Sequence, residues 1–160
     1  MTDNDSTPMN ISTDAQQIAA GAAAILRGVQ RLLRAHAFAS LSEMPLANNR
    51  RADVIAINPQ GAIWIVEIKS SIADFRCDQK WPEYRDYCDA LLFAVAPDFP
   101  AEILPEDTGL IFADAYGGEI MRAAPHHPLS AARRKAVMLS FALMAARRLH
   151  AVGDPGLPVV

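Results

Sequence analysis

The sequence predicts an α/β fold in which a mixed β-sheet is flanked by helices. Apolar residues recur with helical spacing near both ends of the chain, and β-branched runs bounded by turn residues lie between them. The length of 160 residues suits one domain. Hydrophobic residues make up 51% and charged residues 21% of the chain. This composition excludes a disordered or disulfide-framed protein and is sufficient for a buried core.

The first helix is predicted over residues 14–37, after a flexible polar tail at residues 1–12. Thr13 and Gln16 have the spacing of a capping box, and apolar residues then recur every three or four positions. A basic face of this helix, either solvated or in contact with phosphates, consists of Arg27, Arg31 and Arg34.

A β-hairpin is predicted next, after an irregular segment at residues 44–51. Its strands cover residues 53–57 and 62–69, both rich in Ile and Val. The sequence Asn-Pro-Gln-Gly at residues 58–61 is typical of the turn between them.

The second half of the chain alternates helix, strands and helix. Ser71 and Asp74 form another capping box, and Pro82 interrupts a short helical segment that ends near Cys88. The remaining prediction is a buried strand at 90–96, a loop at 97–107, strands at 110–113 and 119–122, a helix at 129–149 and a tail at 151–160. A single domain is therefore expected over residues 13–150.

Neither end of the chain predicts a membrane association. The apolar stretch Ala136–Ala146 is shorter than the roughly 20 residues of a span, so we expect a buried helix. The first residues lack the basic start of a secretory signal. The two cysteines, Cys77 and Cys88, suit a reducing compartment, and a cytoplasmic location is expected.

The charge of the chain is unevenly distributed. The net charge is −3, yet residues 1–26 hold three acids and no base, while residues 27–148 hold all fifteen bases and fourteen acids. This balance argues against a general nucleic-acid coat but allows a local basic surface.

Three ionisable residues occupy unusual positions in the predicted hairpin. Glu67 and Lys69 alternate with apolar residues at the end of the second strand, so both project from one face. Charges on such a strand are costly unless they are paired or hold a metal. Asp53 opens the first strand, and antiparallel pairing brings it beside Glu67.

This arrangement indicates metal-assisted chemistry on phosphates. Two neighbouring carboxylates do not both ionise readily unless a cation lies between them. Carboxylate oxygens suit Mg²⁺ or Mn²⁺, and Lys69 could position or activate an attacking water. The hypothesis is metal-dependent hydrolysis of a phosphodiester.

These residues resemble the PD-(D/E)XK nuclease superfamily, whose signature is an acid on one strand followed by Glu or Asp, any residue and Lys on the next. The stretches at residues 50–86, 113–117 and 132–136 resemble one bacterial branch, the MmcB-like family assigned to DNA repair. The resemblance covers most of residues 15–150. It implies a restriction-endonuclease-like sandwich and DNA as the partner.

The resemblance also implies a role for particular residues. Asp53 and Glu67 would bind Mg²⁺ or Mn²⁺ together with the backbone carbonyl of Ile68, and Lys69 would be the catalytic lysine. Glu43 is a further candidate ligand, as the acid near the end of the first helix. The chain departs from the pattern at Ala52, where the superfamily often has proline.

Polar residues around the motif are candidates for DNA contacts, although each could equally be solvated surface. They are Arg50, Arg51, Arg76, Gln79 and Lys80. Positive charge at the start of the last helix, Arg133–Lys135, opposes the helix dipole and suggests an outside partner such as DNA. The aromatic residues Trp81, Tyr84 and Tyr87 would either pack the core or stack on bases.

Two alternatives remain open from the sequence. The chain could be a catalytically silent adaptor in DNA repair that keeps the nuclease fold and binds DNA, another repair protein or a second copy. It could also be an α/β domain in which Glu67 and Lys69 form a partly buried ion pair.

Overall fold

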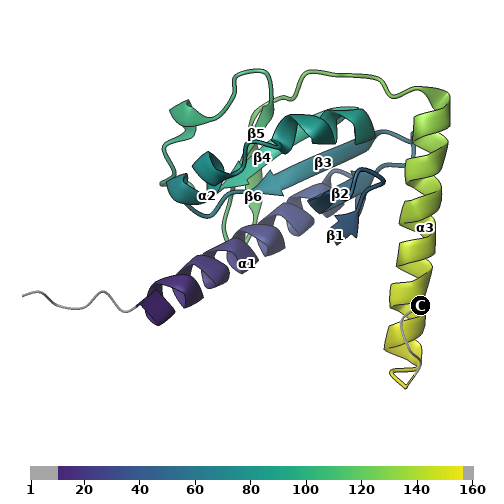
Figure 1. Ribbon diagram of the computed structural model, residues 1–160, viewed down its shortest axis with the longest axis horizontal. Helices are drawn as coiled ribbons and strands as arrows, with labels where there is room; N and C mark the ends of the chain where they lie inside the picture. The colour runs from purple at the N-terminus through teal and green to yellow at the C-terminus, as the bar shows by residue number, and fades with distance from the viewer. Residues whose placement is uncertain (1–10, 157–160) are drawn as a thin grey trace, which may run out of the picture.

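A six-stranded mixed sheet with strand order β1-β2-β3-β4-β5-β6 forms the centre of the protein (Figure 1). The computed structural model describes residues 11–156, with side chains from residue 16 onward. The helices are α1 (Ile11–Ala35), α2 (Ile72–Cys77) and α3 (Ala131–Gly153), with short 3₁₀ helices η1 (Trp81–Tyr87) and η2 (Ala101–Ile103). The strands are β1 (Ala39–Pro45), β2 (Arg51–Ile57), β3 (Ile63–Ile68), β4 (Ala90–Val95), β5 (Gly109–Ala113) and β6 (Gly118–Arg122).

The sheet combines two kinds of pairing. Strands β1, β2 and β3 are antiparallel, β3, β4 and β5 are parallel, and β6 returns antiparallel to β5. Parallel neighbours need a crossover, and α2 with η1 forms the one between β3 and β4. The predicted mixed α/β architecture is confirmed.

The predicted hairpin is confirmed as β2 and β3, with Val54 opposite Val66. Its turn is held by the Asn58 side chain, which accepts hydrogen bonds from the backbone N–H groups of Gln60 and Ala62. Gly61 adopts a left-handed φ of +80° there. This register brings Asp53 close to Glu67.

Strand β1 was not predicted from the sequence. It lies at the edge of the sheet, and Met44 is its one buried residue. Glu43 has a left-handed φ of +55°, which is uncommon for a residue with a side chain. Apolar and polar residues alternate only over Ala39–Ser42 and the alternation breaks at Glu43, so the pattern is too short to identify a strand in the sequence.

One face of the sheet is covered by α1, whose residues Ile25, Val29 and Leu33 are buried in a core cluster with β2–β5. The helix begins at Ile11, ahead of the predicted start, so Thr13 lies within it rather than before it. The side chain of Thr13 and most of the predicted tail lie outside the described residues. Arg31 of the predicted basic face donates to backbone carbonyls of the β5–β6 turn.

The opposite face is covered by η1 and the first part of α3. Val137 is buried there, with Phe141 and Met144 packed against the same cluster. The expectation that this helix is buried was wrong, because Val137 is its one buried residue. By length and composition, α3 is the one helix within residues 11–156 that could cross a membrane, and 6% of its apolar window is buried inside the protein.

A buried carboxylate anchors the start of α3. Asp89, whose side chain is 2% exposed, accepts hydrogen bonds from both terminal nitrogens of Arg134 and from the backbone N–H groups of Ile63 and Leu129. Burial alone would raise the pKa of Asp89, but these hydrogen bonds lower it to about 2. The guanidinium of Arg133 lies 4.8 Å from the ring centre of Tyr87. Both arginines therefore have partners within the protein.

Candidate active site

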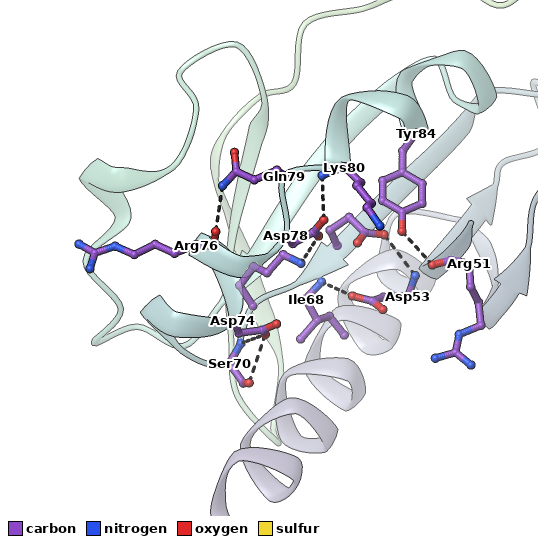
Figure 2. Close-up of polar contacts among 12 residues, drawn as sticks. Arg51, Asp53, Ile68, Ser70, Asp74, Arg76, Asp78, Gln79, Lys80 and Tyr84 are labelled. Carbon is purple, nitrogen blue, oxygen red and sulfur yellow. Dashed lines mark hydrogen bonds and ion pairs between the residues drawn. The ribbon is translucent and has the colours of Figure 1, made fainter. Parts of the chain in front are cut away.

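A cleft of about 510 Å³ opens at the end of β3, between α1 and the α2–η1 segment (Figure 2). It is lined by Ala22, Ala23, Leu26, Glu43, Arg50, Asp53, Glu67, Ile68, Lys69, Asp74, Asp78, Lys80 and Tyr84. Seven of the predicted site residues therefore line one cleft: Glu43, Arg50, Asp53, Glu67, Ile68, Lys69 and Lys80.

Asp53 and Glu67 are joined through the backbone of the hairpin. The backbone N–H of Ile68 donates to Oδ2 of Asp53 at 2.8 Å, and the backbone N–H of Asp53 donates to Oε1 of Glu67 at 3.3 Å. Each carboxylate is therefore oriented by the strand that carries the other one.

Burial disfavours ionisation of both carboxylates, and nearby negative charge adds to this effect. Glu67 is 2% exposed, and burial followed by the charge of Asp53 raises its pKa to about 8. Burial also raises the pKa of Asp53, although its hydrogen bond from Ile68 opposes that change. A cation between the two carboxylates would relieve this cost.

Lys69 does not form the ion pair with Glu67 that one alternative required. Its Nζ donates to Oδ2 of Asp78, just beyond α2, at 2.5 Å. Burial lowers the pKa of Lys69, but the hydrogen bond and charge of Asp78 outweigh it and raise the pKa overall. Lys69 is 4% exposed, so its ammonium is held in a fixed place at the cleft.

The two arginines before Asp53 are also paired with acids. Arg50 forms two hydrogen bonds with the Glu83 carboxylate, both 2.9 Å long. Arg51 pairs with Glu43. The expectation that Glu43 lies near the end of the first helix was wrong, because Glu43 belongs to β1.

Arg76 and Gln79 are not brought into the cleft. In Figure 2 the Arg76 side chain points away from Asp53, and Gln79 donates to the backbone carbonyl of Arg76 at 2.9 Å. Arg76 and Lys80 do not lie on one helix, because α2 ends at Cys77 and Lys80 precedes η1.

The aromatic residues near the cleft serve the core. Tyr84 is buried and its hydroxyl donates to the backbone carbonyl of Arg51 at 3.0 Å. Trp81 packs edge-on against Phe93, with ring centres 5.6 Å apart. Of the two interpretations left open, packing is the one that the structure shows.

Sequence reasoning missed Asp74 and Asp78 as residues of the cleft. In the sequence Asp74 fits a capping box with Ser71, and the backbone N–H of Asp74 donates to Oγ of Ser71, while its Oδ2 accepts from the backbone N–H of Ser70. Asp78 had no motif around it, since its position depends on how the chain turns after α2. Five acidic and three basic side chains line the cleft, giving a formal charge of −2.

The residues present fit a hard divalent cation by their chemistry. The buried Glu67 carboxylate, the half-buried Asp53 carboxylate, both with raised pKa values, and an adjacent backbone carbonyl match the oxygen ligands that Mg²⁺ prefers, with water completing its shell. Among the residues described, no three His, Cys, Asp or Glu side chains form a group that could hold a metal by themselves. Backbone oxygen and water would therefore have to complete the site.

The fold and site define a single mixed α/β unit with paired carboxylates and a lysine at the end of a central strand. The chain belongs to the MmcB-like family of DNA repair proteins, whose family profile matches residues 9–156. It is similar to the solved structure of the SPO1766 protein of unknown function from Silicibacter pomeroyi, at 48% identity and a TM-score of 0.84. That match covers 87% of this chain and 96% of the other. No curated protein matches the chain.

Proposed function

We propose that the protein is a metal-dependent phosphodiesterase of the PD-(D/E)XK type that acts on DNA during repair. The observation that carries this proposal is the placement of Glu67, nearly inaccessible and beside Asp53, at the wall of an open cleft. A fold gains no stability from crowding two carboxylates in this way. Such a pair is typical of a site that a cation completes.

In the proposed reaction Asp53, Glu67 and the Ile68 carbonyl would hold Mg²⁺ or Mn²⁺, with Glu43 as a further candidate. The ion supplies charge stabilisation for a phosphate undergoing displacement. Lys69, held by Asp78, positions the attacking water with its ammonium and stabilises negative charge that develops on the phosphate. Lys80 and Arg50, at the same cleft, contact neighbouring phosphates of the DNA backbone.

The charge of the cleft sets the order of binding. Because its lining is acidic overall, DNA phosphates are repelled until the cation is bound. We therefore expect the affinity for DNA to rise at least tenfold when Ca²⁺ or Mn²⁺ is added at constant ionic strength. If DNA instead bound to an exposed basic surface, added divalent cations would compete with the protein for the phosphates. The affinity of the protein for DNA would then fall.

A cleavage assay tests the proposal. Labelled single-stranded, duplex, flap and branched DNA oligonucleotides are incubated with the protein and Mn²⁺, and products are resolved by electrophoresis. The wild type should cut at least one substrate, and Glu67→Gln and Lys69→Met should each lower the rate at least a hundredfold. Glu102→Gln, on an exposed acid in η2, is the matched control and should keep the wild-type rate.

The second candidate is a catalytically silent adaptor that keeps the nuclease fold. It is favoured by one observation, namely that the Lys69 ammonium already forms a salt bridge with the Asp78 carboxylate. If the protein is such an adaptor, it should bind DNA or a protein without metal and should not cleave DNA. The Glu67→Gln variant should then bind as well as the wild type. Cleavage that disappears in Glu67→Gln would exclude it.

A further inference from the structure

Helix α3 is apolar on two opposite sides. Its inner side, with Val137, Phe141 and Met144, packs on the protein. An apolar stripe also runs along the outer side, spaced at three or four residues: Leu139, Ala142, Leu143, Ala146 and Leu149. A helix that is apolar on both sides is normally covered on both.

This outer stripe is open along its whole length. Leu139 is 58%, Leu143 48% and Leu149 70% exposed, and both alanines are exposed as well. In Figure 1 the second half of α3 extends past β1, and none of the other labelled helices and strands lies against it there. Isolated exposed leucines are common, but a regular row of them marks an interaction surface.

The charges on α3 are all of one sign. Its 23 residues include five Arg and Lys side chains and no Asp or Glu. Arg134 is bound to Asp89, Arg133 lies over Tyr87 and Arg148 donates to the Ser42 carbonyl, so these three have partners. Lys135 and Arg147 are both exposed, and neither forms an ion pair within the part of the chain that the structure describes.

From this pattern we infer that the outer stripe of α3 binds an amphipathic helix of another protein, with acidic residues beside the apolar side of that helix. Alanines at positions 142 and 146 allow a second helix to approach closely, with leucines filling the grooves between turns. Lys135 and Arg147 lie about 18 Å apart along α3, at about 1.5 Å per residue. The partner helix therefore needs acidic groups about three turns apart.

Two other occupants fit the surface less well. A second copy would bring α3 against α3, and with no acid on the helix, either orientation places positive charge near positive charge. A membrane surface would be attracted by the charge, but the stripe has three leucines and no aromatic anchor among its five residues. An acidic helix satisfies both the spacing and the charge.

Site-specific photocrosslinking tests this inference independently of the proposed hydrolysis. The full chain, carrying a photoreactive phenylalanine derivative at position 143, is irradiated in cells that naturally encode it. Adducts are identified by mass spectrometry. The same derivative at position 102, on the exposed 3₁₀ helix η2, is the control. Lys135→Glu/Arg147→Glu is analysed in parallel, after melting shows that it folds like the wild type.

We expect an adduct from position 143 with a segment of another protein that is helical and carries acids about three turns apart. Its yield should fall at least tenfold in Lys135→Glu/Arg147→Glu and be recovered when the partner's acids are changed to lysine. An adduct with a second copy, an adduct with lipid, the absence of any adduct, or a yield unchanged by the charge reversal would each overturn the inference.

Discussion

At the scale of single residues, the most unusual feature is the protonation of Glu67. Burial and the nearby Asp53 carboxylate raise its pKa to about 8, far above the value of an exposed glutamate. The neutral form is therefore favoured in the folded protein around neutral pH when no cation is present. Binding of a divalent cation should release this proton, so metal affinity should increase with pH.

Glu67 gives the stability of the metal-free protein a specific pH dependence. Between the unfolded pKa near 4.5 and the folded pKa of about 8, the native state binds more protons than the unfolded state. Stability should therefore fall as pH rises through this window. We expect Glu67→Gln to remove most of this slope and to match or exceed the wild-type stability at pH 8. Urea unfolding at several pH values in EDTA measures this dependence of stability on pH. If Glu67→Gln keeps the wild-type slope, Glu67 is not the group that causes it.

The positions of Asp53, Glu67 and Lys69 relative to one another could be predicted, but their surroundings could not. The hairpin register follows from two β-branched runs and a turn of fixed length, so the strand ends must meet. Asp78 reaches Lys69 from beyond α2, and its position depends on the tertiary path of a loop. Glu43 was expected near the end of the first helix, and the strand that carries it was missed because the alternation in β1 covers only Ala39–Ser42.

At the scale of elements, α1 packs against the β5–β6 turn through a glycine. A Cβ atom added at Gly28 would overlap the backbone carbonyl oxygens of Asp114 and Gly117, and neither can move cheaply. Gly21, on the same helix, has nothing within 4 Å of such an atom. The two glycines therefore form a matched pair for testing this contact.

Alanine substitutions at these glycines should have opposite effects. Gly28→Ala should lower the free energy of unfolding by at least about 2 kcal/mol through overpacking. Gly21→Ala should be neutral or raise it by up to about 1 kcal/mol through helix propensity. Urea denaturation of both variants checks this, and equal effects would show that α1 does not lie against the turn as described.

The attachment of α3 depends on one buried ion pair. Removing Arg134 leaves the Asp89 carboxylate buried with two backbone donors and no counter-charge. We expect Arg134→Met to destabilise the protein by about 2–4 kcal/mol. Arg133→Ala, which loses a contact with Tyr87, should cost at most about 1 kcal/mol. If thermal or urea unfolding shows equal stability for the two variants, the Asp89–Arg134 pair is not what attaches α3 to the protein.

At the scale of the whole molecule, the architecture could be predicted from the sequence, but the exposure of α3 could not. Strands β2–β6 and the helices at both ends follow from apolar periodicity, which reports which residues avoid water. Apolar periodicity does not distinguish a helix that is buried on two sides from a helix with one apolar side exposed to solvent. The apolar content of α3 suggested a buried helix, whereas its outer stripe is open to solvent.

The charge of the molecule also has consequences beyond the cleft. With a net charge of −3 and an acidic cleft, the chain lacks the general attraction to DNA that strongly basic proteins have. A bound cation supplies positive charge at the site itself. That Asp53 and Glu67 bind a cation is therefore the claim on which the proposed DNA chemistry depends.

Thermal melting with and without Mn²⁺ tests that claim most directly, using wild type, Asp53→Asn/Glu67→Gln and the control Glu102→Gln. A ligand that binds only the folded state at about 100 times its dissociation constant stabilises it by about 2.7 kcal/mol. If the two carboxylates bind Mn²⁺, the Tm should increase by several degrees for wild type and control, and should not change for the double variant. An equal response of all three proteins, or no response of the wild type with or without a DNA oligonucleotide, would contradict it.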